Sequence, residues 1–579
     1  MKSALIRLLL ASVFFWPASC LAQNQLAIPP VLNGPIFNLN VEDSITQFWP
    51  GINTITYGVN GNILGPTLIF NKGDSVTLNV TNNLTGSGNS TTMHWHGLHV
   101  PAMADGGPHM VINQGATWSP SFKVMNDAGT FWYHPHGLNK TDRHVSKGVA
   151  GFIIVRDSQE AALTLPRTYG QDDFPLVIQT KEFDVLNQIA ISTFMDTTVM
   201  VNGTVSPYLN IPGQMVRFRL LNGASQRTFQ LGFSNNMNFY VIGNDGGLLD
   251  TPTPVNRLLL SNGERAEIVL DFSMLINDTV YLKCFGSELQ HGIYGADSVG
   301  DNGANQIPDY YNNPLNGIDF NILELRVGAQ TPNPITIVPF NLIPQTPLVP
   351  DPTTVYRRFE IDTMGSMGVT PNYAFGPFAF NQVMFDMDSI NEYVMLNAKE
   401  VWTVFNKSMI AHPFHIHDVQ FNILDISGNP PPLYERGKKD VVMILPGDSV
   451  RFITQFTDFA DDMVPYMYHC HILHHEDDGM MGSFLVIDTT GTSGLHDLSA
   501  LPGIQVYPVP AADLLKVRIS EAVAQAKISV YSLEGRIALP AFTIHQQAAD
   551  VNIASMLPGV YFLTVQTDRG TFTEKFVKQ

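Results

Sequence analysis

The run HCHILHHEDDGMM at 469–481 places a cysteine between two histidines, and it limits the possible fold of this chain more than any other stretch. In an extended strand, successive side chains point to opposite faces. His469 and His471 would then point to one side and Cys470 to the other. A cysteine, histidines and a weakly bound methionine are the ligands of a blue-copper electron-transfer site. The run therefore predicts a strand that offers metal ligands on both of its faces.

Histidine pairs recur in three other motifs: HWHG and HPHG early in the chain, and HPFHIH later. In an HxH pair at strand spacing, both side chains share one face. The first histidine of HPFHIH lies behind a proline and can point to the other side. Each of the two late clusters therefore offers two ligands to one site and at least one ligand to a second. The histidines of these three motifs are His94, His96, His134, His136, His412, His415 and His417.

These four motifs, in this order, resemble the copper motifs of three-domain multicopper oxidases of the bacterial laccase, copper-efflux oxidase and bilirubin oxidase types. The resemblance covers roughly residues 35–490, and no ligand position departs from the family pattern. It implies an all-β fold of three cupredoxin-like Greek-key β-sandwich domains. It also implies an oxidoreductase that couples one-electron oxidation of a donor to the four-electron reduction of O2 to water, with four copper ions as cofactors.

The resemblance gives each ligand residue a role, and Cys470 would carry electrons to the neighbouring His469 and His471. The ligands implied for the mononuclear blue copper, with the axial methionine last, are His412, Cys470, His475 and Met480. The ligands implied for the single copper of a three-copper cluster are His94 and His415. The ligands implied for the coupled copper pair of that cluster are His96, His134, His136, His417, His469 and His471.

Two carboxylates near these motifs are candidates for general acid catalysis, because protons must reach a buried cluster. Asp105, in the run ADGGP, and Glu476, directly after His475, match acidic positions that the family uses in this way. The alternative for Asp105 is a turn residue, since Asp-Gly-Gly favours turns. The alternative for Glu476 is a partner that orients a ligand through a hydrogen bond.

The chain has 579 residues, which is too many for a single core. Its 46 glycines, 38 prolines and short alternating apolar runs are typical of β-sandwiches. Three units are expected at roughly 26–160, 170–330 and 353–490, with a Pro-rich linker at 331–353. The second unit carries no metal motif and is expected to act as a spacer. Its polar loop 286–317 is expected to be a disordered surface loop, or alternatively to shape the approach to the mononuclear copper.

Both ends of the chain carry targeting features. Residues 1–22 are typical of a secretory signal peptide, and no later run is long and apolar enough to span a membrane. Residues 504–579 are expected to form a small β-sandwich, and they resemble a type IX secretion sorting domain. That resemblance implies passage through the periplasm to the medium or the cell surface, with the type IX machinery as a partner. The alternative is a carbohydrate-binding or adhesion module.

The net charge of −19 excludes nucleic acid as a natural partner and suits neutral or cationic donors. Ser408 and Ile410 stand where cuprous oxidases place Asp and Met ligands, which weakens a cuprous substrate. A laccase-like phenolic donor is therefore expected, with a metal ion, in a role in copper tolerance, as the alternative. A copper-less structural homologue is disfavoured because such proteins lose ligands. Only Cys284 and Cys470 would remain after signal cleavage, and no disulfide is expected.

Overall fold

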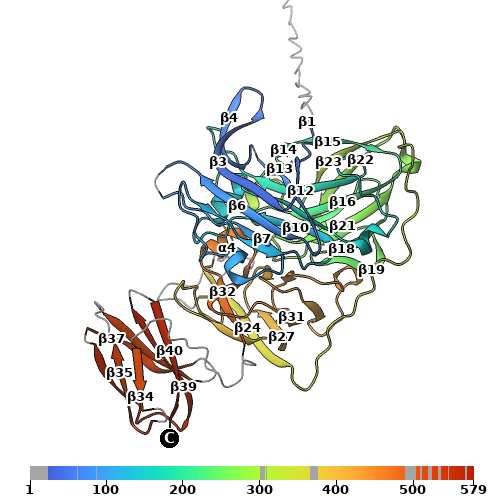
Figure 1. Cartoon of the computed structure of the whole chain (residues 1–579). Helices are drawn as coiled ribbons and strands as arrows, with labels where there is room; N and C mark the ends of the chain where they lie inside the picture. Colours follow the sequence, from blue (N-terminus) through green and yellow to red (C-terminus); the bar gives the residue numbers. More distant parts are fainter. Residues whose placement is uncertain are drawn as a thin grey trace, which may run out of the picture.

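The computed structural model describes residues 24–578 apart from several gaps, and four β-sandwiches follow one another along the chain (Figure 1). The predicted signal peptide 1–22 lies outside the described residues. The positions left out within the described range are 62, 87, 300–306, 308–309, 365–375, 489–503, 509–510, 520–524, 533–535, 546 and 568–569.

The first unit packs two sheets, in the strand orders β2-β5-β11-β10-β7 and β4-β3-β6-β8. Apolar and polar residues alternate in the run SVTLNVTNN. Val76, Leu78 and Val80 therefore face the core, while their neighbours face outward. The strands of this unit are β2 (Val31–Asn33), β3 (Ile36–Trp49), β4 (Ile52–Val59), β5 (Thr67–Asn71), β6 (Ser75–Asn83), β7 (His94–His96), β8 (Thr117–Trp118), β9 (Ser121–Lys123), β10 (Gly129–His134) and β11 (Gly151–Arg156).

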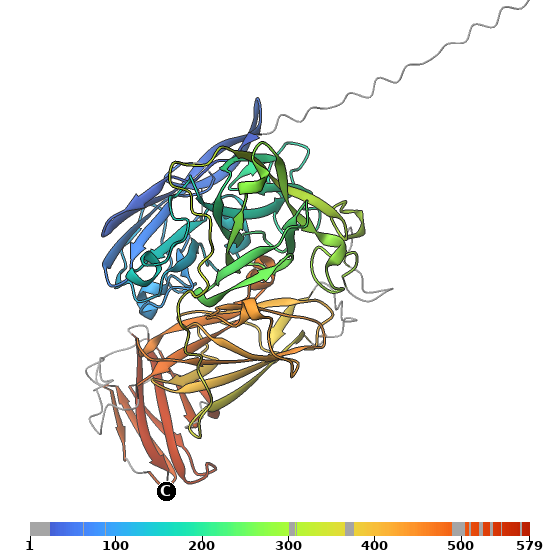
Figure 2. The ribbon, with the colours of Figure 1, turned by 90° about the vertical axis from the view of Figure 1, so that its right-hand side faces the viewer.

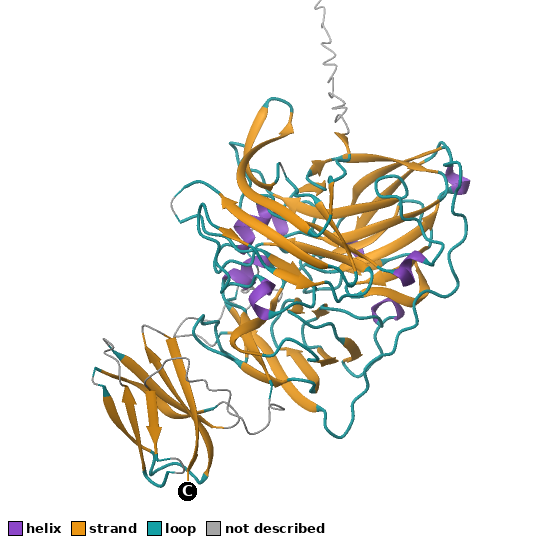
Figure 3. Ribbon diagram, viewed as in Figure 1, coloured by secondary structure: helices purple, strands orange, loops and turns teal. Residues whose placement is uncertain are grey.

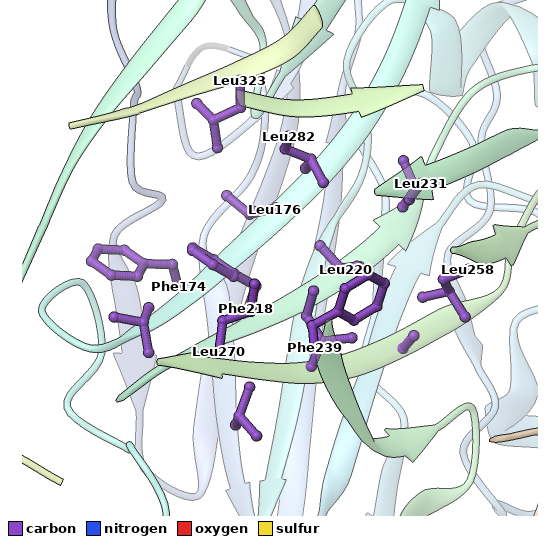
Figure 4. Close-up of a cluster of buried hydrophobic side chains, with 14 of the residues drawn as sticks. Phe174, Leu176, Phe218, Leu220, Leu231, Phe239, Leu258, Leu270, Leu282 and Leu323 are labelled. Atoms are coloured by element: carbon purple, nitrogen blue, oxygen red, sulfur yellow. The ribbon is translucent and has the colours of Figure 1, made fainter. Parts of the chain in front are cut away.

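The second unit packs the sheets β1-β15-β23-β22-β17-β20 and β14-β13-β12-β16-β21-β18-β19. Leucine and phenylalanine side chains of both sheets meet in its core (Figure 4). The strands are β1 (Asn24–Gln25), β12 (Asp173–Lys181), β13 (Thr198–Val201), β14 (Thr204–Val205), β15 (Pro207–Pro212), β16 (Met215–Asn222), β17 (Phe229–Phe233), β18 (Phe239–Asn244), β19 (Gly247–Val255), β20 (Leu258–Leu260), β21 (Arg265–Asp271), β22 (Thr279–Phe285) and β23 (Asp319–Gly328).

The first described residues join the second unit rather than the first. Strand β1 pairs in parallel with β15, and Leu26 packs into the core of the second unit. The expected start of the first unit at residue 26 therefore falls in a segment that adds an edge strand to its neighbour. Such a strand ties the two units together through backbone hydrogen bonds, including Leu26 N to Tyr208 O at 2.8 Å.

The third unit packs the sheets β25-β24-β27-β31-β29 and β26-β33-β32-β28-β30. Its core is rich in aromatic side chains, with Trp402 fully buried among phenylalanines. The strands are β24 (Val355–Thr363), β25 (Phe378–Phe380), β26 (Glu392–Met395), β27 (Lys399–Asn406), β28 (His412–Ile416), β29 (Asn422–Ile426), β30 (Val441–Ile444), β31 (Ser449–Gln455), β32 (Asp461–Cys470) and β33 (Met481–Ile487).

The Pro-rich linker 331–353 crosses the second unit in an extended form before it enters the third. Met215 N donates to Ile335 O at 2.9 Å, and Leu342 N donates to Asp250 O at 2.8 Å. Leu342 is buried in the core of the second unit. The linker is therefore fastened to the surface that it crosses.

The C-terminal sandwich packs two sheets around a core of its own and lies beside the third unit (Figures 1 and 2). The strands are β34 (Ile504–Tyr507), β35 (Leu514–Ile519), β36 (Ala526–Ser532), β37 (Ile537–Ile544), β38 (Ala548–Asn552), β39 (Gly559–Thr567) and β40 (Gly570–Lys578).

Strands dominate the molecule, and the helices are short pieces between them (Figure 3), which confirms the expected all-β fold. None of the helices among the described residues has the length and apolar character needed to cross a membrane. The helices are α1 (Ala102–Asp105), α2 (Thr141–Ser146), α3 (Ser158–Ala161), α4 (Leu473–Asp477), η1 (Ser273–Leu275), η2 (Gly286–Glu288), η3 (Tyr310–Asn312) and η4 (Leu433–Glu435).

Candidate metal centre

Two pairs of antiparallel strands carry most of the predicted ligands. In the third unit, β28 pairs with β32, so that His415 lies opposite His469. In the first unit, β7 pairs with β10, so that His94 lies opposite His134. Residues that face each other across antiparallel strands point to the same side of the sheet. Strand pairing therefore gathers histidines from distant motifs at the surface where the first and third units meet.

A first group of ligands surrounds the sulfur of Cys470. Its Sγ lies 3.5 Å from Nδ1 of His412 and 3.5 Å from Nδ1 of His475. His475 sits on α4, directly after the strand that carries Cys470. Met480 is tied to both through its backbone, since Cys470 N donates to Met480 O and Met480 N donates to His475 O. All four residues are buried.

Burial determines the protonation states of Cys470 and His412. It raises the pKa of the Cys470 thiol above its usual value and lowers the pKa of His412 to about 3. The imidazole is therefore neutral at physiological pH, which is the form that binds metal. A thiolate in such a place requires a cation to offset its desolvation, and a bound metal ion supplies it. The residues thus fit a mononuclear copper.

The imidazoles of this first group differ in their remaining contacts. Nε2 of His412 lies 2.8 Å from the hydroxyl of Ser408, whereas Nε2 of His475 is buried without a hydrogen-bond partner. The rings of Phe378 and Tyr294 lie 4.8 and 6.0 Å from that of His475. Aromatic side chains therefore surround the imidazole that has no other partner.

Tyr294 belongs to the loop 286–317, several described residues of which are buried against the third unit. The tyrosine is 3% exposed, and Tyr310 from the same loop is 2% exposed. Both pack into the core cluster that contains Cys470. The expectation of a disordered surface loop was wrong for these residues, because their apolar side chains reach across the unit boundary. Tyr294 thereby covers the first group of ligands at the imidazole of His475.

A second group consists of eight buried histidines, four from the first unit and four from the third. Short distances between ring nitrogens divide six of them into two sets of three. In one set, Nε2 of His469 lies 3.1 Å from that of His136 and 3.3 Å from that of His417. In the other, Nδ1 of His96 lies 3.4 Å from His134 Nε2 and 3.3 Å from His471 Nε2.

The two remaining histidines, His94 and His415, each direct one unpartnered nitrogen toward these sets. Nδ1 of His94 donates to the carbonyl of Asp105 at 2.9 Å, and Nδ1 of His415 donates to that of Asp440 at 2.7 Å. Their Nε2 atoms are buried without hydrogen-bond partners. Buried polar atoms are normally satisfied, so two orphaned nitrogens beside other imidazoles fit a metal ion. The nitrogens of His94, His415 and His417 lie within 4.8 Å of one another, as do those of His94, His96 and His134, so the orphaned nitrogens adjoin both sets.

Asp105 is more than a turn residue. It ends α1, and its Oδ2 accepts a hydrogen bond from Nδ1 of His417 at 2.7 Å. Burial alone would raise the pKa of this carboxyl, but the attraction of His417 and His94 lowers it below its usual value. Asp105 thus orients two ligand histidines, one through its carboxylate and one through its carbonyl oxygen.

Glu476 lies between His136 and His469 of the second group. Its Oε1 is 3.3 Å from Nδ1 of His136, and its Oε2 is 3.3 Å from Nδ1 of His469. Thr141 donates a hydrogen bond to Oε1 at 2.7 Å. Burial, followed by the repulsion of Asp477, raises the pKa of Glu476 well above its usual value. This carboxyl is therefore suited to hold a proton beside the cluster.

Four further side chains reach the ligands or their partners, and sequence reasoning assigned none of them a role. Oδ1 of Asp440 lies 3.1 Å from Nε2 of His96, and Arg265 pairs with the same carboxylate. His99 pairs with Asp418, the residue that follows His417. Asp418 adjoins a ligand in the sequence, which is a usable signal, whereas no motif links Arg265 to Asp440.

Comparisons with known families agree with this geometry. Two models described as multicopper oxidase match residues 40–160 and 348–490. A third model, described as a secretion system C-terminal sorting domain, matches residues 505–579. The multicopper oxidase mco of Staphylococcus haemolyticus is 34% identical over 460 residues, which covers 78% of this chain and 88% of that protein. The cell division protein FtsP of Escherichia coli is 31% identical over 479 residues, which covers 81% and 94%.

Solved structures give the same result. The laccase-like multi-copper oxidase CueO from Ochrobactrum sp., described with activity towards lignin model compounds, superposes with a TM-score of 0.68 at 32% identity. The match covers 80% of this chain and 100% of that one. The McoA multicopper oxidase of Aquifex aeolicus superposes with a TM-score of 0.70 at 29% identity, covering 81% and 100%.

Proposed function

Because the chain belongs to the multicopper oxidase family, and is therefore a copper-dependent oxidoreductase, we propose that it holds four copper ions and oxidises phenolic donors with O2 as the acceptor. The observation that carries this proposal is the adjacency of Cys470 and His469. One belongs to the first group of ligands and the other to the second, so a single peptide joins the two. An electron accepted at the first group has a covalent path to the second.

We assign the copper ligands from the two groups. His412, Cys470 and His475 would hold the mononuclear copper, with Met480, which is buried in the same core cluster, as a weaker fourth ligand. His94 and His415 would hold the single copper of the cluster through their unpartnered Nε2 atoms. The ligands of one member of the copper pair are His136, His417 and His469. The ligands of the other member are His96, His134 and His471.

Copper bound there would supply one-electron transfer at the mononuclear site and the reduction of O2 to water at the cluster. The protein holds the ligands in place and delivers protons. Glu476, buried between His136 and His469, is the proposed general acid. Asp105 is proposed to serve the opposite side, where it also holds His417 in one orientation.

The surroundings of His412 favour a phenol over a cuprous ion. Ser408 contacts His412 through a neutral hydroxyl, and Ile410 is fully buried. Neither side chain offers the carboxylate or thioether that a substrate metal ion would need. The imidazole of His475 is covered instead by the buried aromatic rings of Tyr294 and Phe378.

A binding role without copper, as some family members have, is disfavoured by the ligands. The cysteine and all ten ligand histidines are present and buried. Keeping so many neutral imidazoles out of water is costly without a metal ion to bind them. The cell division name of the FtsP relatives therefore does not decide the role of this chain.

The deciding experiment is oxygen uptake by the copper-loaded full chain, with a methoxyphenol and with cuprous ion in parallel. Faster uptake with the phenol supports the proposal. Faster uptake with cuprous ion replaces the phenol by a metal substrate, with a role in copper tolerance. Uptake with neither, despite a full copper content, overturns the proposed donor.

The match of residues 505–579 to a sorting domain supports a secreted or cell-surface location. We propose that the chain crosses the periplasm and leaves through the type IX machinery, which would recognise the C-terminal sandwich. Copper and O2 would then meet the enzyme outside the cytoplasm.

A further inference from the structure

A buried arginine of the second unit reaches the boundary between the other two. Arg265 begins β21 and is 1% exposed. Its Nη1 and Nη2 atoms each donate to one oxygen of Asp440 at 2.6 Å. This is the bidentate geometry in which a guanidinium and a carboxylate fix each other most firmly. Asp440 itself is fully buried and precedes β30 of the third unit.

The carboxylate and the backbone of Asp440 each hold a ligand histidine. Oδ1 accepts from Nε2 of His96, which comes from the first unit, at 3.1 Å. The carbonyl oxygen accepts from Nδ1 of His415, which comes from the third unit, at 2.7 Å. With Nε2 of His96 donating, its Nδ1 keeps a free lone pair, and this nitrogen faces His134 and His471. One aspartate thus fixes the orientation of two histidines from different units.

Every donor of Arg265 is used. A guanidinium has five N–H groups, and two of them bond to Asp440. The other three donate to the carbonyl oxygens of Thr130, Gly263 and Asp245, at 3.1, 3.0 and 2.9 Å. Thr130 lies on β10, the strand that ends at His134. The guanidinium therefore cannot rotate without breaking contacts to all three units.

We propose that Arg265 and Asp440 are positioning residues that set the docking of the first and third units and the tautomer of His96, and that the cluster loses copper when either is changed. The second unit, expected to be a spacer, would then take part in assembling the cluster. This inference rests on the proposed copper sites. It concerns the three-copper cluster alone, because neither residue contacts the group around Cys470.

The test compares Arg265→Lys with Arg219→Lys in the copper-loaded full chain. Arg219 is a matched control, since it is equally buried in the same unit and forms a bidentate pair with Asp173, but contacts no ligand histidine. Two quantities are measured during titration with a copper chelator. The first is copper per chain. The second is the spectrum of each site, read as the blue absorption for the thiolate site and as the electron paramagnetic resonance signal for the cluster.

We expect Arg265→Lys to release cluster copper at chelator concentrations lower by about 10- to 100-fold, the usual effect of losing a partner of a metal ligand, while the blue absorption persists. Arg219→Lys should match the wild type in both. Equal release of cluster copper by Arg265→Lys and the control would overturn the inference. If Arg265→Lys does not fold, Asp440→Asn, which keeps the shape of the side chain, decides by the same two readouts. A wild-type chain that binds no cluster copper would instead refute the proposed function.

Discussion

The hydroxyl oxygen of Ser408 lies 2.8 Å from Nε2 of His412. The same hydroxyl lies 2.7 Å from the side-chain oxygen of Asn406 and 3.0 Å from the carbonyl of Ile410. A serine has one hydrogen to give, and both of these neighbours can only accept it. The hydroxyl must therefore accept from His412, whose protonated nitrogen is Nε2. Its Nδ1, which faces the sulfur of Cys470, is left with a free lone pair for copper.

Removing this hydroxyl should weaken the mononuclear site. Ser408→Ala leaves Nε2 of His412 without an acceptor, and loss of such a partner lowers metal affinity by about 10- to 100-fold. We expect the blue absorption to disappear at correspondingly lower chelator concentration. Ser408→Thr retains the hydroxyl and serves as the control. Equal chelator resistance of Ser408→Ala and the wild type would show that the hydrogen bond does not support the site.

Replacing the thiol of Cys470 should abolish the mononuclear site and leave the cluster intact. Cys470→Ser removes the sulfur that gives a blue-copper site its colour, so both the blue absorption and donor-dependent oxygen uptake should be lost. The cluster ligands remain, and its paramagnetic signal should persist. Cys284→Ala, which removes the buried thiol of the second unit, is the control and should stay blue. A blue Cys470→Ser variant would refute the assignment of this ligand.

Glu476 has a carboxyl that is buried between two cluster histidines. Replacing this carboxyl by an amide should slow the reaction of the enzyme with O2. Glu476→Gln keeps an oxygen for Thr141 to bond but cannot deliver a proton. We expect the fully reduced enzyme to be reoxidised by O2 about 100-fold more slowly or worse, the usual contribution of a general acid. Anaerobic reduction by the donor should be unchanged.

The same reoxidation measurement on Asp105→Asn distinguishes the two carboxylates. Slower reoxidation would place both in proton delivery. An unchanged rate would leave Asp105 with the orienting contact to His417 as its only role. If Glu476→Gln also reacts at the wild-type rate, protons reach the cluster by another route.

A buried lysine in the second unit should reduce the stability of the fold at neutral pH. Burial lowers the pKa of Lys181 from 10.5 to about 8, and Asp142 offsets only part of this effect. Because the folded pKa lies below the unfolded one, the charged lysine destabilises the folded state fully below pH 8, and the penalty vanishes above pH 10.5. Lys181→Met should therefore raise the free energy of unfolding at pH 7 by up to about 3 kcal/mol.

Chemical denaturation at pH 7 and again near pH 10 checks this sign. The advantage of Lys181→Met over the wild type should shrink at the higher pH. Lys123→Met, at an exposed position, should change little at either pH. A variant less stable than the wild type at pH 7 would mean that the lysine contributes more through its contacts than its desolvation costs.

Deleting residues 504–579 should abolish export and leave catalysis intact. The C-terminal sandwich has its own core, and its described residues contribute no ligand to either group. We expect the shortened chain to keep its blue absorption and oxygen uptake, and to remain inside the cell that makes it. Secretion of the shortened chain at the normal level would contradict the sorting role.

Strand periodicity could predict which histidines of the HxH and HCH motifs share a face, because it converts spacing directly into faces. The four sandwiches were foreseeable for the same reason. The assignment of ligands to individual copper ions came from the family resemblance and stays a prediction. The contact between Arg265 and Asp440 could not be predicted, because 174 residues lie between them and neither stands in a motif. The buried position of Tyr294 was also missed. The loop around it is polar on average, and composition does not reveal that a few apolar side chains cross a unit boundary.

The placement of Cys470 between two cluster histidines has a mechanical consequence. Docking of separate units brings His94 to His415, so any loosening of that interface can part them. Cys470 and His469 share a peptide bond, and no movement of the units can lengthen it. The reaction with O2 therefore depends on how the units are docked, whereas the covalent electron path between the two groups of ligands does not.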